Sequence, residues 1–208
     1  GNEIKNTIFF FEYNFFTYIL NTIFLFFFFN STPLFLAAER NNIEIINFLF
    51  LQKGIEIGPY CFEGCSSLTQ IDIPSSITTI EYYAFHGCSS LQKVTIPSTV
   101  TIIEASAIEG RLSLFEVIIP SSVTEIKASA FNECSSLKNI KLTSSIKVID
   151  EYAFSGCSSL TEIEIPSSLT EIKDYTFSGC SSLVNIKIPS SITEINEYLF
   201  ANCTGLTE

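Results

Sequence analysis

The sequence has no tryptophan, no methionine and one histidine, His86. A single histidine cannot form a two-histidine metal site, and it leaves one isolated base for histidine-dependent catalysis. Without methionine the chain has no initiator residue, and it opens with Gly1, so we expect a fragment or a processed product. These absences favour a protein without enzymatic activity, without a cofactor and without a metal.

Basic residues are scarce: the sequence has 11 lysines and arginines and 22 acidic residues, which gives a net charge of −11. Most of the excess lies in residues 57–208, which hold 17 acidic and 8 basic residues. A surface of this sign repels phosphates, so we predict no nucleic-acid partner. The hydrophobic content of 47% is sufficient for a substantial core.

From residue 57 onward the sequence repeats every 23 residues. A fixed period of this length is the signature of stacked structural repeats. One column is always leucine and a second is aromatic except at Ile108; about seven rungs are visible, the first and last incomplete. The leucines are Leu68, Leu91, Leu114, Leu137, Leu160, Leu183 and Leu206; the aromatic residues are Phe62, Phe85, Phe131, Phe154, Phe177 and Phe200.

Each unit predicts one coil. Alternation in residues 160–166 predicts a short strand that stops at Pro166, and residues 168–172 predict a second extended piece. Residues 175–180 predict a tight helical turn closed by Gly179. Because one coil cannot cover its own apolar side, stability has to come from stacking. We therefore predict a β-rich solenoid of the leucine-rich-repeat type, with coils of 23 residues.

Six of the seven cysteines share one repeat position, which Arg111 takes in the remaining unit, while Cys61 lies outside the column. We predict a ladder of small buried thiols that donate weakly to backbone carbonyls at the turn. Disulfides between rungs are disfavoured because in-register side chains point parallel to one another. A metal site at Cys61 and Cys65 lacks a second pair of ligands. The column is Cys65, Cys88, Cys134, Cys157, Cys180 and Cys203.

The unit that contains Arg111 departs from the repeat in several places. Ile108 replaces phenylalanine, and Leu112 and Ile118 replace polar residues. Drift explains such changes, since a repeat tolerates substitutions while its neighbours still stack. The alternative is a local anchor for a partner, formed by Phe115 and Ile118 beside Arg111.

Residues 31–56 predict a pair of short helices that resembles a single ankyrin repeat. Thr32-Pro33-Leu34-Phe35 stands where the usual opening is Thr-Pro-Leu-His. One ankyrin unit cannot fold alone, so either further copies precede it or this copy packs on the solenoid.

Residues 1–30 form a phenylalanine-rich segment. The stretch 8–29 is interrupted by Glu12, Asn14 and Asn21, and it is marginal for a membrane span, which needs about 20 apolar residues. No clear small-residue cleavage site follows it. The alternatives are membrane association, a degenerate ankyrin helix or an incorrectly translated leader.

The repeat Ala-Phe-x-Gly-Cys-Ser-Ser-Leu-x-x-Ile-x-Ile-Pro-Ser-Ser resembles that of the BspA-like, or Treponema-type, leucine-rich-repeat family over residues 57–208. Members occur in bacteria and parasitic protists, and many are regarded as surface proteins that bind host matrix or other cells. The resemblance implies a surface antigen or adhesin whose partners are host, matrix or cell-surface proteins. Some protist members also carry an ankyrin-like portion, so a cytoplasmic ankyrin/leucine-rich-repeat scaffold is the alternative.

If the family's architecture carries over, the side chains between the strand apolar residues form one continuous face. We predict that this face binds the partner; the alternative is a merely solvated sheet. A surface protein is expected to be partly oxidised or modified at Asn30 or Asn202, and a cytosolic one to keep free thiols. The predicted face comprises Gln70, Asp72, Lys93, Thr95, Arg111, Phe115, Glu116, Ile118, Asn139, Lys141, Glu162, Glu164, Asn185 and Lys187.

Overall fold

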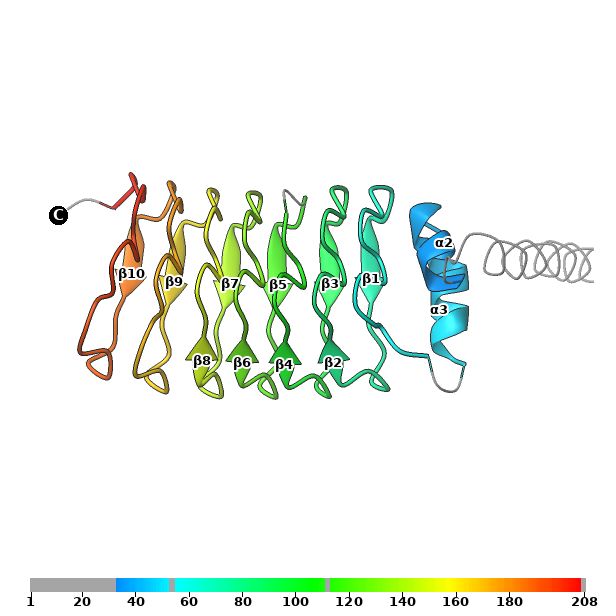
Figure 1. Ribbon diagram of the computed structural model, residues 1–208, viewed down its shortest axis with the longest axis horizontal. Coiled ribbons are helices and arrows are strands. Elements are labelled where there is room, and N and C mark those ends of the chain that lie inside the picture. Colours follow the sequence, from blue (N-terminus) through cyan, green and yellow to red (C-terminus); the bar gives the residue numbers. More distant parts are fainter. Residues whose placement is uncertain (1–32, 53–54, 111–112, 207–208) are drawn as a thin grey trace, which may run out of the picture.

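The computed structural model describes residues 33–52, 55–110 and 113–206. A row of coils stacks along one axis, and two short helices lie at one end, beside the first strand (Figure 1). The phenylalanine-rich stretch 8–29 and Arg111 lie outside the described residues. The helices are α2 (Pro33–Glu39) and α3 (Ile43–Phe50). The three-residue strands are β1 (Gln70–Asp72), β3 (Lys93–Thr95), β5 (Glu116–Ile118), β7 (Asn139–Lys141), β9 (Glu162–Glu164) and β10 (Asn185–Lys187); the two-residue strands are β2 (Thr79–Ile80), β4 (Ile102–Ile103), β6 (Glu125–Ile126) and β8 (Val148–Ile149).

The strands pair in parallel, in register with the repeat. Gln70 pairs with Lys93, Lys93 with Glu116, and Glu116 with Asn139, so each step advances one unit. Strands β1, β3, β5 and β7 form one sheet, and β9 and β10 pair with each other in the same way. Strands β2, β4, β6 and β8 form the opposite sheet. The predicted β-rich solenoid of short parallel strands is confirmed.

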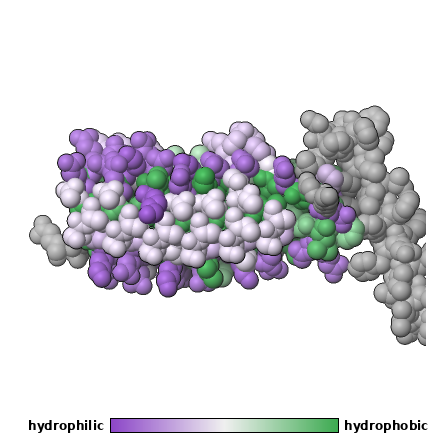
Figure 2. Space-filling view, turned by 90° about the horizontal axis from the view of Figure 1, so that it is seen from below, coloured by the Kyte–Doolittle hydropathy of each residue, from purple (hydrophilic) through white to green (hydrophobic). Residues whose placement is uncertain are grey.

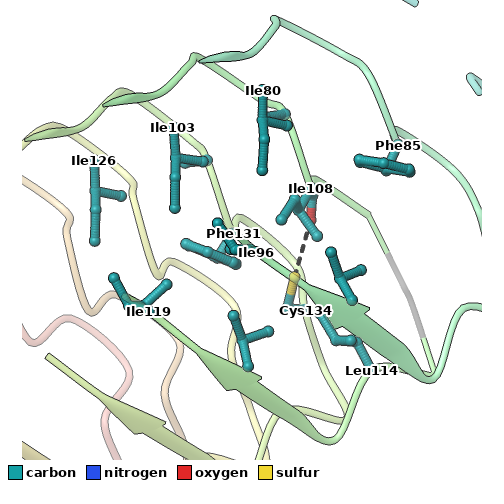
Figure 3. Packing of buried hydrophobic residues seen from close by; sticks show 14 of the residues in the cluster. Ile80, Phe85, Ile96, Ile103, Ile108, Leu114, Ile119, Ile126, Phe131 and Cys134 are labelled. Carbon is teal, nitrogen blue, oxygen red and sulfur yellow. Dashed lines mark hydrogen bonds between the residues drawn. The ribbon is translucent and has the colours of Figure 1, made fainter. Parts of the chain in front are cut away.

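The core is a stack of identical columns between the two sheets. Figure 3 shows Ile80, Ile103 and Ile126 in one row, one residue from each coil. The leucine column from Leu68 to Leu183 has no exposed surface. Successive rings of the aromatic column stack, as at Phe62 and Phe85 with centroids 5.1 Å apart. Repetition therefore places like against like, which is the packing that a solenoid needs.

Ile108 takes the aromatic position of its coil and is also fully buried, between Phe85 and Phe131 (Figure 3). This departure from the repeat is an exchange inside the core, and it places no apolar group on the surface. Drift therefore explains Ile108. Phe115 and Ile118, in contrast, are exposed on the surface.

The turn at residues 175–180 and its counterparts in the other coils lie along the upper edge in Figure 1, and each is called an upper turn. Two residues of each upper turn have left-handed backbone: Tyr175 has φ 57° and Gly179 has φ 75°. Between them Ser178 N–H donates to the Tyr175 carbonyl at 3.0 Å, as expected for a tight turn. Glu133 takes the glycine position in one coil with φ 57°, so glycine is favoured there and not obligatory.

The cysteine column forms the predicted thiol ladder. From Cys88 onward, each thiol of the column donates to the backbone carbonyl of the residue at the aromatic position in the preceding coil. Cys88 Sγ lies 3.0 Å from the Phe62 oxygen, and Cys134 Sγ lies 3.0 Å from that of Ile108 (Figure 3). All seven cysteines lie among the described residues, and none forms a disulfide. The ladder ties the upper turns together through weak, buried hydrogen bonds.

The second sheet ends at β8, although the sequence predicts an extended piece in every unit. Up to that point each coil donates to the preceding one, as when the Asp150 N–H donates to the Ile126 carbonyl at 3.0 Å. In the next coil Thr176 replaces the fully buried alanine of the four preceding units, and its hydroxyl donates to the Lys173 carbonyl at 2.7 Å and the Asp150 carbonyl at 3.4 Å. The segment before Thr176 is not a strand, while the turn that contains it keeps the left-handed backbone of the other turns at Tyr175 and Gly179.

Helices α2 and α3 pack against the first coil. Ala37 and Ile46 are buried in the same apolar cluster as Ile57 and Phe62. The Cys65 thiol donates to the Phe35 carbonyl in α2 at 3.8 Å, so the helix takes the place of a preceding coil in the thiol ladder. A packed pair at this end covers apolar surface that the first coil would otherwise expose to water.

Asn41, in the loop between the helices, joins them to the first coil by accepting from both the Thr69 N–H at 3.0 Å and the Thr69 hydroxyl at 3.2 Å. Replacing Asn41 with glycine keeps its left-handed backbone, φ 51°, and removes the acceptor. We expect the free energy of unfolding to fall by about 1–2 kcal/mol, because the partly buried Thr69 N–H loses its partner. Urea unfolding measures the loss. The exposed Asn47 of α3, changed to alanine, is the control; equal stability of the two variants would contradict this joint.

Candidate functional site

The outward side chains of the three-residue strands form one face of the solenoid. In β1 to β9 each middle residue is buried and the residues on either side are exposed, and in β10 the middle residue is half-buried. Every described residue of the predicted face is exposed on this surface, and Arg111 lies outside the described residues. Parallel in-register pairing brings these side chains into straight rows along the solenoid.

A shallow groove of about 870 Å³ runs across β5, β7, β9 and β10. It lies over the junction between β7 and β9, where one sheet ends and the two-stranded sheet begins. Gln70 and Asp72, on β1, do not reach it. The predicted residues that it brings together are Glu116, Ile118, Asn139, Lys141, Glu162, Glu164, Asn185 and Lys187.

A smaller hollow of about 150 Å³ lies beside the groove, across β3 and β5. Lys93, Thr95 and Phe115 line it, and Glu116 and Ile118 line both hollows. Phe115 is 50% exposed and Ile118 is 71% exposed. The irregular unit therefore presents two large apolar side chains at the point where the two hollows meet.

Charge on the face is mixed and weakly paired. In one row Lys141, Glu164 and Lys187 alternate in sign, and Lys187 Nζ lies 3.7 Å from Glu164 Oε1. On the first strands the Thr95 hydroxyl donates to Asp72 Oδ1 at 2.7 Å. Both contacts are exposed, so each contributes little to folding and leaves these groups available to a partner.

The thiols of the cysteine column have low reactivity. Burial raises the pKa of the Cys88 and Cys180 thiols to about 12 from the ordinary 9.0, and it raises the pKa of Cys134 and Cys157 as well. The thiolate is the nucleophile and the metal ligand, so these thiols are poor at both tasks near neutral pH. Within residues 33–52, 55–110 and 113–206, no group of three or more histidine, cysteine or acidic side chains is placed to hold a metal ion.

His86 lies in an upper turn, with its side chain 37% exposed and Nδ1 3.9 Å from Glu109 Oε2. Its ring meets that of Tyr83 edge-on, with centroids 5.4 Å apart. These contacts agree with a histidine held in a turn. Among the described helices, none has the length and apolar character needed to cross a membrane.

The lower edge of the solenoid consists of the Pro-Ser-Ser turns, and Figure 2 shows it as one pale band of intermediate hydropathy. Its hydroxyls bond within the fold. Ser122 Oγ donates to the Val100 carbonyl at 2.6 Å and Ser168 Oγ to the Ile146 carbonyl at 2.7 Å, each in the preceding coil. These serines therefore stabilise the stack and are not free for catalysis.

One feature of the surface is absent from the sequence-based site. Tyrosines recur at one upper-turn position in five coils, and their rings stack in two groups, a pair in the first two coils and three in the last three, that line neither hollow of the sheet face. The signal was the same 23-residue spacing that revealed the leucines. The tyrosines are Tyr60, Tyr83, Tyr152, Tyr175 and Tyr198.

Comparison with known proteins identifies the repeat. The family model for the BspA type leucine-rich repeat region matches residues 55–151 and 124–208. No curated protein matches the chain.

Solved structures agree with this match. A T. pallidum leucine-rich-repeat protein is 31% identical with a TM-score of 0.63, over 65% of this chain and 64% of that one. A Bacteroides ovatus leucine-rich-repeat protein is 27% identical with a TM-score of 0.53, over 73% of this chain and 57% of that one. One from Eubacterium ventriosum is 27% identical with a TM-score of 0.56, over 67% of this chain and 44% of that one. The chain therefore spans less than two thirds of the length of these relatives.

Proposed function

This chain belongs to the BspA-type leucine-rich-repeat family, whose repeats are generally protein-interaction modules, and from that premise we propose that it is a non-enzymatic surface protein that binds a protein partner through its sheet face. The partners we propose are host, extracellular-matrix or cell-surface proteins. Support for display at the surface comes from the resemblance of the repeats to those of surface antigens and adhesins.

The observation that carries the proposal is the groove across β5, β7, β9 and β10, with Phe115 and Ile118 at its margin. Protein interfaces concentrate their binding energy in a few apolar anchors surrounded by polar groups that exclude water. Here the anchors are exposed on a face whose other outward strand side chains are polar or charged. Alternating charges such as Lys141 and Glu164 add selectivity more than affinity.

The second candidate is an intracellular ankyrin/leucine-rich-repeat scaffold. It is favoured by the helix pair α2 and α3, which packs on the first coil in the way expected if a single ankyrin-like unit rests on the solenoid. The free thiols are compatible with it too, because reducing compartments preserve them. Membrane association through residues 8–29 remains a prediction from the sequence.

Changing Phe115 and Ile118 together to serine should weaken binding of the purified chain to intact cells or to immobilised matrix proteins by at least roughly tenfold, because it removes two exposed anchors. Binding of the labelled chain across a concentration series measures the effect. Val184→Ser is the matched control, since Val184 is also 54% exposed and occupies the repeat position of Phe115, yet lies outside both hollows. Equal binding by all three chains would leave repeat drift as the explanation of the irregular unit.

Location is tested by labelling intact source cells with a membrane-impermeant amine reagent and recovering the chain with an antibody to the repeats. Labelling before lysis supports the surface protein. Labelling that occurs only after lysis would contradict display and favour the scaffold. A cytosolic protein recovered from the same cells serves as the control for leakage.

A further inference from the structure

The tyrosine column ends in a rigid, exposed stack. Tyr152, Tyr175 and Tyr198 lie in consecutive upper turns, with ring centroids 4.8 and 5.0 Å apart and ring planes 6° and 5° apart. Tyr152 is 38% exposed and Tyr198 is 57% exposed. Neither hollow of the sheet face includes any of the three. The stack is therefore a surface of its own, separate from the groove.

The fold does not require tyrosine at this position. Two central coils carry Ser106 and Ser129 there, with φ 54° and 57°, which matches the 57° of Tyr152 and Tyr175. Left-handed backbone is costly for any residue with a β-carbon, and a bulky ring brings no relief from that cost. The turn therefore forms with serine, and the exposed rings contribute something that the turn itself does not need.

An acidic residue directly precedes each of these three tyrosines in the sequence, and no other coil has an acid at that position. The acids are Glu151, Asp174 and Glu197; the other coils have Pro59, Tyr82, Ala105 and Ala128 there. Among the described residues, no lysine, arginine or histidine forms an ion pair with any of the three acids. The neighbouring Lys173 instead binds Glu171, with Nζ 2.7 Å from Oε2. The stripe thus combines ordered aromatic rings with unpaired negative charge.

We propose that this tyrosine ladder, defined as Tyr152, Tyr175 and Tyr198 with the acid that precedes each, binds a basic helical segment of a protein partner. Tyrosine gives a large, amphipathic contact area for little loss of side-chain entropy, and stacking has already restricted these rings. The carboxylates select lysine or arginine, whose aliphatic stems pack along the rings while the charged ends pair. This surface is additional to the sheet face.

The spacing selects a helix over an extended peptide. One α-helical turn advances about 5.4 Å, close to the ring spacings of 4.8 and 5.0 Å, so a helix parallel to the solenoid axis offers one basic residue to each coil. Side chains on one face of a strand recur about every 6.7 Å and fall out of register within two coils. A partner with lysine or arginine at i, i+4 and i+7 fits the ladder.

The test uses the full chain and a fluorescent, capped alanine-based peptide of about 16 residues with lysine once per turn, long enough to be partly helical in water. Anisotropy titration at low salt should give saturable binding that weakens as salt is raised. Changing all three tyrosines to serine, the residue that Ser106 and Ser129 show the turn accepts, should weaken binding at least roughly tenfold. The charge-neutral triple variant Glu151→Gln, Asp174→Asn and Glu197→Gln, which alters only surface groups, should weaken it comparably and abolish most of the salt dependence.

Two comparisons separate this surface from the sheet face. The chain with Phe115→Ser and Ile118→Ser should bind the peptide as the unaltered chain does, and a peptide with a central proline, which breaks the helix, should bind at least roughly tenfold more weakly. Unchanged binding by the tyrosine-to-serine chain would overturn the proposal. Equal binding of the proline peptide would overturn it as well, and so would loss of binding in the Phe115 and Ile118 variant, which would place the peptide on the sheet face.

Discussion

Replacing Leu160 with alanine should lower the free energy of unfolding by about 2–5 kcal/mol, the range found when a buried leucine is truncated. Leu160 has no exposed surface and lies in the middle of the leucine column, between Leu137 and Leu183. Its loss leaves a cavity between two coils, and stacking between neighbouring coils is the main source of stability in a solenoid. Because the damage lies mid-stack, it weakens the contact between the two halves of the array.

Urea unfolding followed by circular dichroism measures this loss. The matched control is Thr161→Ala, which changes the adjacent, exposed residue and should shift stability by less than about 0.5 kcal/mol. A Leu160→Ala chain that unfolds at the same urea concentration as the parent would contradict the assignment of the leucine column to the core.

Raising the pH above 9 should destabilise the chain steeply through the thiol ladder. Burial raises the pKa of Cys88 and Cys180 from 9.0 to about 12, so the unfolded chain releases these protons long before the folded chain does. The stabilising contribution is complete below pH 9 and is lost as pH rises toward 12. Within that window, each such thiol lowers the free energy of unfolding by about 1.4 kcal/mol for every pH unit.

The pKa of Cys134 and Cys157 is also raised, so four thiols act together and the slope approaches roughly 5 kcal/mol per pH unit. Since the whole stability of a domain is about 5–15 kcal/mol, we expect unfolding within a few pH units above 9. Urea midpoints between pH 8 and 11 measure the slope. The double variant Cys88→Ala and Cys180→Ala should have a visibly flatter profile, because two titrating groups are gone. A midpoint that stays constant over this range would contradict the buried ladder.

The repeat predicts most of the fold because each column constrains the next. A period of 23 residues with leucine always in the same place determines that like residues stack, and parallel in-register pairing of Gln70, Lys93 and Glu116 follows. The thiol ladder was predictable for the same reason, since a small residue that recurs at the same turn position has a carbonyl of the preceding coil within reach. The interior positions determine how the coils stack, because only they are restricted by neighbouring coils on both sides.

Features that occur once could not be predicted in this way. The bonds from Thr69 to Asn41 join residues 28 apart with no periodic counterpart. The second sheet ends at β8, although the apolar positions of its strands continue in the next coil at Leu169 and Ile172. Each arises from a local fit that a column of similar residues does not encode.

The candidate site was predicted in part. Alternation within the strands places residues such as Lys141 and Glu164 outward, and pairing aligns them. The groove itself depends on how several coils sit together, and no single unit contains that information. The spacing alone reveals the tyrosine ladder. Only the structure shows that serine has the same left-handed backbone at this position, so that the turn does not require tyrosine.

Photo-crosslinking shows whether the sheet face contacts a protein partner. A photo-reactive amino acid is placed at Lys141, inside the groove, and in a second chain at Ser167, exposed in a lower turn on another edge. Each chain is illuminated on intact cells and on immobilised matrix proteins. We expect a discrete crosslinked product from position 141 that is lost when Phe115 and Ile118 are changed to serine, and no product from position 167. Equal products from both positions, or a product from position 167 alone, would contradict it.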